Sequence, residues 1–213
     1  MNASARLTFF HSPNTRSSGA YILLEELCAP FELHVVNMKA GEQRKPEYLA
    51  VNPMGKVPAI RHGDALVTEQ GAVFLYLADM FPKAGLAPAI GDPLRGPYLR
   101  WMVYYGSCFE PAVVDRSQKR EPAPAAMSPY GDFDTMFRTL TDQLAKGPYI
   151  LGERFTAADV LWGTALTWIT RFKLVPELPV IKAYCDRINA RPSVAKVRAK
   201  DTELVAAQAA SAA

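Results

Sequence analysis

Short apolar runs and helical periodicities alternate over the first 80 residues of the chain. Apolar runs bounded by turn residues are typical of buried strands, whereas apolar residues three or four positions apart favour a helix. The pattern predicts strands at 7–10, 31–36, 58–60 and 65–67, and helices after the polar stretch 12–15, at 45–51 and at about 70–80. The first of these helices ends near Pro30, because proline disfavours helical backbone in the residue before it.

The hydrophobic pattern changes after residue 81. The order of the preceding elements is that of a thioredoxin-like α/β layer, in which sheet and helices share one core. Proline and glycine then punctuate the chain as far as residue 97, which indicates a linker. Beyond it only helical spacings occur, and the apolar faces that they predict are Leu94, Tyr98, Trp101, Tyr105 and Cys108; Leu161, Ala165, Trp168 and Phe172; and Ile181, Tyr184 and Ile188.

These patterns predict two domains. The expected limits are 1–82 for the thioredoxin-like domain, 83–97 for the linker and 98–213 for an all-helical domain. We expect the alanine-rich segment after Asp201 to fray.

A capping box is expected at the start of one helix of the second domain. Thr156 and Asp159 have the [ST]-x-x-[DE] spacing, in which each side chain can satisfy a backbone N–H of the other residue. This motif predicts a stabilising role and no chemistry.

Composition and charge exclude several classes of function. A net charge of +3, with scattered basic residues, does not favour nucleic-acid binding. No apolar stretch approaches a membrane span, and the N-terminus has no signal-peptide pattern, so we expect a cytoplasmic protein without membrane contact. The cysteines (28, 108 and 185) and histidines (11, 34 and 62) lack metal-ligand spacing, so reduced thiols and no metal site are expected.

Val57-Pro58, at the start of a predicted strand, is the most informative pair of the first domain. Proline is tolerated at the first residue of a strand because the missing N–H breaks no ladder there. A cis bond between these residues would leave the backbone of Val57 free to pair with an extended peptide. The acidic helix entry at Glu69 would suit the amino group of such a ligand. A small peptide ligand is therefore expected.

Three motifs together resemble those of the glutathione S-transferase superfamily, and the resemblance covers nearly the whole chain. They are Asn52-Pro53-x-Gly55-x-Val57-Pro58, Thr68-Glu69-Gln70-x-Ala72-Val73-x-x-Tyr76-Leu77 and Phe155-Thr156-x-x-Asp159. Bacterial cytosolic members are the most similar group. The resemblance implies a homodimer of two-domain subunits, with a thioredoxin-like and an all-helical domain and with glutathione as cosubstrate.

The resemblance also assigns residues to glutathione. Val57 would pair through its backbone with the cysteinyl unit, and Pro58 would be the cis proline. Glu69 would face the γ-glutamyl end. Gln70 stands where the family usually has serine, so the carboxylate site there would have an altered geometry. Gln43 and Lys56 would lie near the glycyl carboxylate.

The catalytic position departs from the family pattern. The glutathione thiol must be held as a thiolate, and hydrogen-bond donors at a helix N-terminus favour the charged form. Relatives use Ser, Tyr or Cys here, whereas the alignment offers Asn14, Thr15, Arg16 and Ser17 as candidates. Helix N-capping is the alternative role for the polar residues of this loop. A mixed disulfide through a protein thiol is not expected, because the loop has no cysteine.

No sequence motif identifies the residues that would bind the second substrate. By resemblance, the segment 101–109 would line it, and its aromatic residues favour core packing over substrate stacking. The proline-rich stretch 119–130 is long enough to suggest a lid.

The resulting expectation is a detoxifying transferase that directs the glutathione thiol against a small hydrophobic electrophile. A glutathione-dependent disulfide reductase or peroxidase shares the same residues. A non-catalytic interaction protein with this fold is the alternative from another class.

Overall fold

The computed structural model describes residues 6–121 and 123–210. They form two compact units, one made of residues 6–84 with 191–210 and the other of residues 85–190. The fold class expected from the sequence, an α/β thioredoxin-like layer and an all-helical region, is confirmed. The domain limits at 82 and 98 stay a prediction, and the last helix is grouped with the sheet rather than with the helical unit.

The first unit is built on a four-stranded mixed sheet in the order β2-β1-β3-β4. Its strands are β1 (Leu7–His11), β2 (Glu32–Val35), β3 (Ala59–His62) and β4 (Ala65–Val67). β1 runs parallel to β2 and antiparallel to β3, and β3 is antiparallel to β4. Phe9 is paired with Leu33 on one side and with Ile60 on the other, so the buried β1 lies in the middle of the sheet.

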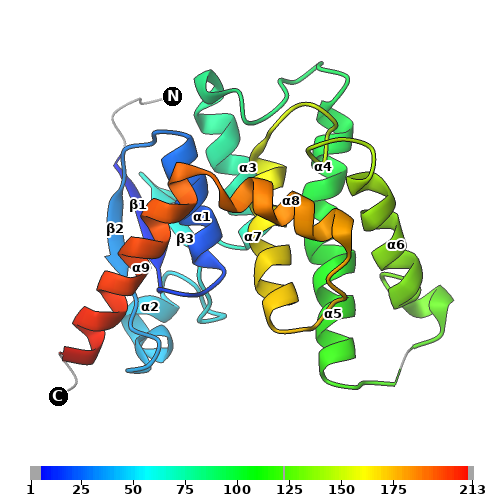
Figure 1. Ribbon diagram of the computed structural model, residues 1–213. Coiled ribbons are helices and arrows are strands. Elements are labelled where there is room, and N and C mark those ends of the chain that lie inside the picture. Colours follow the sequence, from blue (N-terminus) through cyan, green and yellow to red (C-terminus); the bar gives the residue numbers. More distant parts are fainter. Residues whose placement is uncertain (1–5, 122, 211–213) are drawn as a thin grey trace. The chain divides into compact units, whose positions relative to one another are not determined.

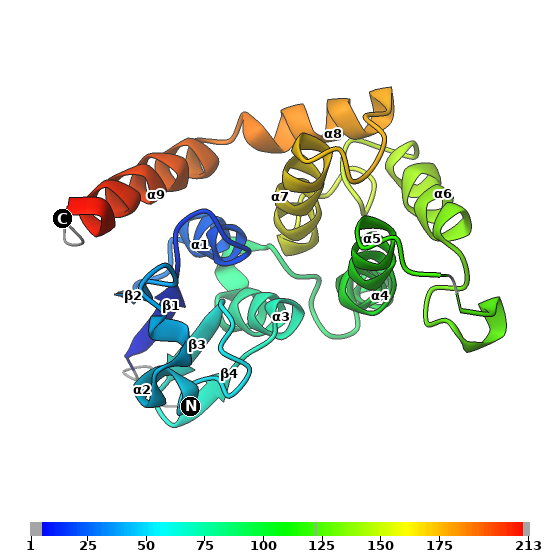
Figure 2. The same cartoon turned by 90° about the horizontal axis from the view of Figure 1, so that it is seen from below.

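Helices cover both faces of this sheet (Figure 2). α1 (Ser17–Glu26) and α3 (Gln70–Met80) lie on one face, and the short α2 (Pro46–Leu49) lies on the other. Because side chains alternate along a strand, Phe9 meets Tyr21 of α1, whereas Phe10 meets Tyr48 of α2. A 3₁₀ turn (Glu42–Arg44) precedes α2, and another (Pro82–Ala84) follows α3.

The C-terminal helix α9 (Pro192–Ala210) packs beside α1 (Figure 1). Arg191 and Ser193 donate to the carboxylate of Glu26, and Lys196 pairs with Glu25 at 2.6 Å. The segment after Asp201 is helical to Ala210, so the expectation that it frays is wrong. Val194, Val197 and Asp201 are the buried residues of α9, and the segment after them continues the same helix, since alanine has the highest helix propensity.

The second unit consists of helices. They are α4 (Arg95–Tyr104), a π-helical turn (Tyr105–Phe109), α5 (Glu110–Ser117), α6 (Phe133–Leu144), α7 (Ala157–Arg171) and α8 (Pro179–Asn189), with a 3₁₀ turn (Ala125–Met127) between α5 and α6. Of the predicted apolar faces, the one of α8 is confirmed, because Ile181, Tyr184 and Ile188 are all buried.

Two details of the predicted helical faces are wrong. The π-helical turn carries an extra residue in its ring, and Phe109 rather than Cys108 is fully buried there. In α7 the predicted Trp168 and Phe172 are 46% and 55% exposed and contact each other, while Leu166 and Ile169 are buried instead. The apolar spacing of α7 fits two adjacent faces, and only the packing selects one of them.

Candidate functional site

The loop between β1 and α1 carries the four candidate thiol-activating residues. Asn14 and Arg16 are exposed, Thr15 is half-buried and Ser17 is fully buried. Asn14 has a φ of 57°, a left-handed conformation that asparagine tolerates better than most residues. The Thr15 hydroxyl donates to the carbonyl oxygen of Ser12 at 2.7 Å, so the loop is closed by its own side chains.

Ser17 is held from behind by two residues that the sequence analysis did not select. His11 Nδ1 lies 2.8 Å from Ser17 Oγ, and His11 Nε2 lies 2.9 Å from Asp201 Oδ1. The second oxygen of Asp201 accepts from the Asn14 N–H at 2.9 Å and from the Ser18 hydroxyl at 2.6 Å. A histidine that ends a buried strand directly before a polar loop was the available signal for His11. No local pattern marks Asp201.

Asp201 is a buried carboxylate that stays ionised. Burial by itself raises its pKa, but the hydrogen bonds from His11, Ser18 and the Asn14 N–H outweigh burial and lower the pKa below its usual value. A charged acceptor forms stronger hydrogen bonds than a neutral one. The loop is therefore anchored to α9 by charge-assisted bonds.

The start of α3 holds Glu69 and Gln70. Glu69 has φ 64° and ψ 122°, a conformation that residues other than glycine rarely adopt, and such strain is concentrated at functional sites. Gln70 donates from Nε2 to the carbonyl oxygen of Arg16 at 3.4 Å, whereas its Oε1 is buried and has no hydrogen-bond partner. The first candidate loop and the start of α3, more than 50 residues apart in sequence, thus meet within one unit.

The Asn52-Pro53-x-Gly55 motif shapes the approach to β3. The side chain of Asn52 donates to the carbonyl oxygen of Lys56 at 2.9 Å, and the hydroxyl of Tyr48 donates to the same oxygen at 2.6 Å. Gly55 has a φ of 60°, and a Cβ there would lie 2.7 Å from the carbonyl oxygen of Gln43. Only glycine allows this close approach, which brings the segment of Gln43 next to that of Lys56.

Val57, Pro58 and Gln43 complete the set of predicted ligand residues. The Val57–Pro58 peptide bond is cis. The side chain of Val57 packs in an apolar cluster with Phe10, Val36, Tyr48, Val51 and Ala59. Gln43 Oε1 is buried and, like that of Gln70, has no hydrogen-bond partner. The exposed Lys56 adds a positive charge beside this segment.

The first unit thus offers groups of both charges to a small ligand. Arg16 and Lys56 are cationic, Glu69 is anionic, and two glutamine side chains have an unpaired acceptor oxygen. A peptide with carboxylates and an amino group complements such a set. In the described residues no group of three or more His, Cys, Asp or Glu side chains is placed to hold a metal ion.

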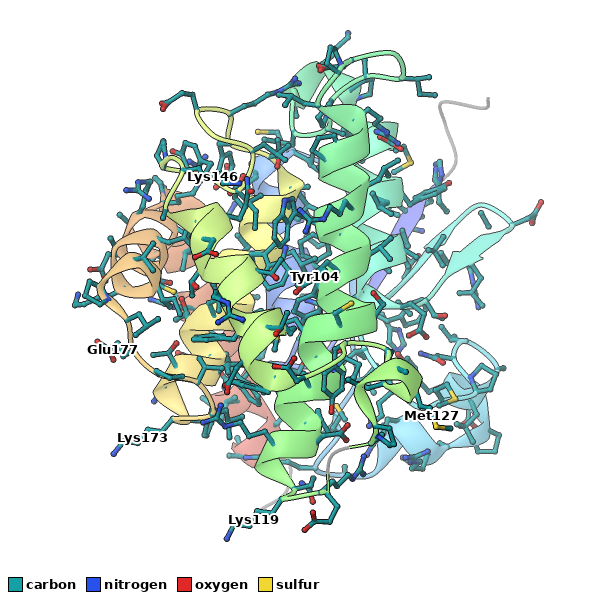
Figure 3. All side chains as sticks on the ribbon, turned by 90° about the vertical axis from the view of Figure 1, so that its right-hand side faces the viewer. Tyr104, Lys119, Met127, Lys146, Lys173 and Glu177 are labelled. Atoms are coloured by element: carbon teal, nitrogen blue, oxygen red, sulfur yellow. The ribbon has the colours of Figure 1, made fainter. Side chains whose placement is uncertain are left out.

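The aromatic residues of α4 and the π-helical turn form core in the second unit. Trp101, Tyr105 and Phe109 are buried and surround Trp162 of α7 at ring-centroid distances of 4.9–5.9 Å. Tyr104, labelled in Figure 3, donates to the carbonyl oxygen of Met136 in α6 at 3.0 Å. The expectation that core packing prevails over substrate stacking agrees with these contacts.

The long connection between α5 and α6 is bound to α5 by more than one residue, and its Arg120 donates to Asp115 Oδ1 at 2.8 Å. Its Tyr130 donates to Asp115 Oδ2 at 2.9 Å, whereas Met127 is 80% exposed (Figure 3). A lid role for this connection stays a prediction.

The capping box at the start of α7 is present. Asp159 Oδ2 accepts from the Thr156 N–H at 2.8 Å, and Oδ1 accepts from the Ile150 N–H and the Tyr184 hydroxyl at 2.7 and 2.9 Å. Burial raises the pKa of Asp159 to about 6, although all these hydrogen bonds oppose the shift.

None of the helices in residues 6–121 and 123–210 combines the length and the apolar character of a membrane span.

Comparisons with known proteins agree with this architecture. The model of the glutathione S-transferase N-terminal domain matches residues 5–79, and that of the C-terminal domain matches residues 130–187. Glutathione S-transferase GstA of Escherichia coli O157:H7 is 29% identical over 88% of this chain and 95% of its own length. The disulfide-bond oxidoreductase YfcG of E. coli K12 is 25% identical over 91% and 95% of the two chains.

A solved structure extends the comparison to a liganded relative. The glutathione transferase homologue from Sulfitobacter, crystallised with bound glutathione, is 31% identical with a TM-score of 0.74, and the match covers 92% of this chain and 98% of the other. Family models match both halves of the chain, and solved members share its fold over nearly its full length. The chain therefore belongs to the glutathione S-transferase superfamily.

Proposed function

We propose that this protein is a glutathione-dependent transferase whose sheet unit binds glutathione and activates its thiol. The relatives that are named glutathione S-transferases and the glutathione-bound homologue support this proposal. The observation that carries it is the hydrogen bond between Gln70 and the Arg16 carbonyl, which joins the loop of thiol-activating candidates to the strained start of α3. A ligand spanning the two would meet opposite charges and free acceptors.

The proposed glutathione contacts follow the charges of the ligand. The backbone of Val57 pairs with the cysteinyl unit beside the cis Pro58. The carboxylate of Glu69 receives the γ-glutamyl ammonium group, and the amide of Gln70 with the α3 N-terminus receives the adjoining carboxylate. Gln43 and Lys56 bind the glycyl end.

Unpaired acceptors support this arrangement energetically. A buried oxygen without a hydrogen bond costs about 1–3 kcal/mol. Peptide N–H and ammonium groups of glutathione would pair the Oε1 atoms of Gln43 and Gln70 and relieve this cost.

The chemistry that we propose is stabilisation of the thiolate. The glutathione thiol has an unperturbed pKa of about 8.5, as cysteine does. The side-chain amide of Asn14 and the charge of Arg16 favour the anion and lower that pKa, whereas the Thr15 hydroxyl already donates to the Ser12 carbonyl oxygen. The thiol proton leaves to solvent, the sulfur forms a bond to an electrophilic carbon, and the leaving group departs with its electron pair. Ser17 is enclosed, so we assign it to holding the loop.

Reduction of small disulfides is the second candidate activity. It is favoured by the similarity to a disulfide-bond oxidoreductase. In that reaction the glutathione thiolate would attack one sulfur of the substrate disulfide, forming a mixed disulfide with glutathione and releasing the other sulfur as a thiolate, since the loop offers no protein thiol. Peroxidase activity would use the same thiolate. A non-catalytic binding protein of this fold is the alternative outside enzymes.

Assembly and location belong to the proposal as well. The resemblance implies a homodimer, a cytoplasmic location and a detoxifying role toward small hydrophobic electrophiles. Sedimentation equilibrium of the purified protein tests the dimer.

Calorimetric titration with reduced and then oxidised glutathione tests the proposed function. We expect saturable binding that weakens about 10- to 100-fold in Glu69→Ala, since a charge-assisted hydrogen bond is worth about 1.5–3 kcal/mol. Glu177→Ala is the matched control, because Glu177 is an exposed glutamate of the other unit. Preference for oxidised glutathione would favour disulfide reduction. Absence of binding by either form at millimolar concentration would refute the transferase and favour the interaction protein.

A further inference from the structure

We propose that Asp201 and His11 are positioning residues, which fix the loop that activates the thiol from the C-terminal helix. The inference rests on the proposed function, because it assigns the support of the thiol-activating loop. Asp201 comes from α9, more than 180 residues after the loop. It nevertheless makes three hydrogen bonds of 2.6–2.9 Å, one to Asn14 in the loop and two to residues that flank it, His11 at the end of β1 and Ser18 in α1.

The first route runs directly to Asn14. The backbone N–H of Asn14 donates to Asp201 Oδ2, and Asn14 is held in a left-handed conformation. Asn14 is also exposed, so its side-chain amide is accessible to a ligand. The carboxylate thus fixes the backbone from which a donor to the glutathione sulfur projects.

The second route runs through His11 to Ser17 and Thr15. Because Asp201 is an ionised acceptor, His11 Nε2 carries the proton of their hydrogen bond. His11 Nδ1 is hydrogen-bonded to Ser17 Oγ at 2.8 Å, and the Ser17 hydroxyl donates to the carbonyl oxygen of Ser12 at 3.1 Å. Ser17 Oγ in turn accepts from the Ser12 N–H at 3.1 Å and contacts Thr15 Oγ1 at 2.7 Å. The side chains of Asp201, His11, Ser17 and Thr15 are thus linked in series by hydrogen bonds, which fixes their relative positions.

This chain of groups is not a hydrolytic triad. The order of aspartate, histidine and serine is that of one, but Ser17 and His11 are both fully buried. Ser17 Oγ is enclosed by partners from the loop itself, so no substrate carbonyl can reach it. The network therefore acts on the loop and not on a substrate.

Asp201 could position the loop or merely dock α9 on α1. The other contacts between α9 and α1 allow these two roles to be separated. Glu26 binds Arg191 and Ser193, and Glu25 binds Lys196, but neither of these pairs touches the loop. If Asp201 served only to dock α9, loss of the Glu26 contacts would have the same effect on the site. Glu26→Gln is therefore the matched control for Asp201→Asn.

The experiment compares the wild-type protein, Asp201→Asn and Glu26→Gln. For each, glutathione affinity is measured by calorimetry, the pKa of the bound thiol by the ultraviolet absorbance of the thiolate, and kcat/KM against pH with an activated aryl halide. We expect Asp201→Asn to raise the thiol pKa and to lower kcat near neutral pH about 10- to 100-fold, the size of effect that loss of a partner has when it orients a metal ligand. KM for glutathione should change less than kcat. Glu26→Gln should leave the thiol pKa unchanged.

Two further variants keep the test decisive. His11→Gln cuts only the second route, and we expect the same direction of change with a smaller size. In an Asn14→Ala background, Asp201→Asn should add less than its effect in the wild type, because both changes remove one coupled contribution. Circular dichroism of each variant shows whether it folds.

The outcomes separate this inference from the proposed function. Wild-type binding of glutathione with an unchanged thiol pKa in both Asp201→Asn and His11→Gln overturns the positioning role alone. Equal effects of Asp201→Asn and Glu26→Gln also overturn it, since they reduce Asp201 to a docking contact. Absence of glutathione binding by the wild type refutes both proposals.

Discussion

Two aspartates, one in each unit, are both buried and hydrogen-bonded, but their pKa values are shifted in opposite directions. Asp159 on α7 and Asp201 on α9 are 0% and 4% exposed, and each accepts several hydrogen bonds. Burial raises the pKa of Asp159 to about 6, whereas the pKa of Asp201 is lowered.

Asp159 is the more deeply buried of the two, and the partners differ as well. Asp159 has neutral donors only, from two backbone N–H groups and from the hydroxyls of Thr156 and Tyr184. Asp201 has the imidazole of His11 in addition to neutral donors. Asp159 also draws most of its donors from its own helix and the preceding turn, whereas Asp201 collects its donors from the opposite end of the chain. Asp159, with mostly local partners, stabilises the start of α7. Asp201, with distant partners, holds the loop between β1 and α1.

The largest effect is expected from Asp159→Ala. It leaves the Ile150 N–H, the Thr156 N–H and the Tyr184 hydroxyl without their acceptor in a buried place. We expect a loss of about 4 kcal/mol in the free energy of unfolding at about pH 4, where the stabilising contribution of Asp159 is still present, because each unpaired buried donor costs about 1–3 kcal/mol. Urea unfolding followed by circular dichroism measures it. A loss no larger than that of Asp201→Asn would show that the two carboxylates do not divide their roles as proposed.

The pH dependence of stability should have opposite signs for the two residues. Asp159 has a raised pKa in the folded state, so its stabilising contribution is complete below about 3.8 and is lost as the pH rises through about 6. The loss amounts to about 3 kcal/mol. Asp201 has a lowered pKa, so its contribution is present above the usual aspartate pKa and is lost as the pH falls through its folded-state value.

Urea unfolding midpoints measured at several pH values between acidic and neutral test these two opposite dependences of stability on pH. Asp159→Asn should remove the decline in stability that accompanies a rise in pH toward 6. Asp201→Asn should remove only the decline in stability at acidic pH. The same slope in both variants would contradict the assignment of opposite pKa shifts.

The smallest effect is expected from Lys196→Ala. The ion pair of Lys196 with Glu25 is on the surface, and exposed pairs contribute little because solvent screens them. We expect an unchanged urea midpoint and unchanged glutathione binding. A clear fall in either quantity would mean that docking of α9 depends on its surface charges rather than on Asp201.

The sheet unit could be predicted closely from the sequence. Its four strands and the helices α1, α2 and α3 lie near the expected ranges, since short apolar runs, prolines and glycines mark their ends. Gly55 illustrates why the motif is informative: its close approach to Gln43 admits no side chain. The faces of the long helices were less certain, and Trp168 shows that apolar spacing alone does not tell core from surface.

The contact between His11 and Asp201 could not be predicted from the sequence. Periodicity describes neighbours along one element, whereas this contact joins residues 190 positions apart. The roles of the predicted glutathione residues stay predictions, because a ligand contact depends on backbone groups such as those of Val57 that any residue carries.

The hydrogen bonds of Asp201 also have a consequence for biosynthesis. The loop that contains Asn14 leaves the ribosome well before the carboxylate that holds it, because Asp201 follows Asn14 by 187 residues. The nascent sheet can pair its strands early, but its loop acquires the native hydrogen bonds only after the segment that forms α9 has left the ribosome. A truncated translation product would thus contain every strand of the glutathione-binding unit and still lack an ordered thiol site.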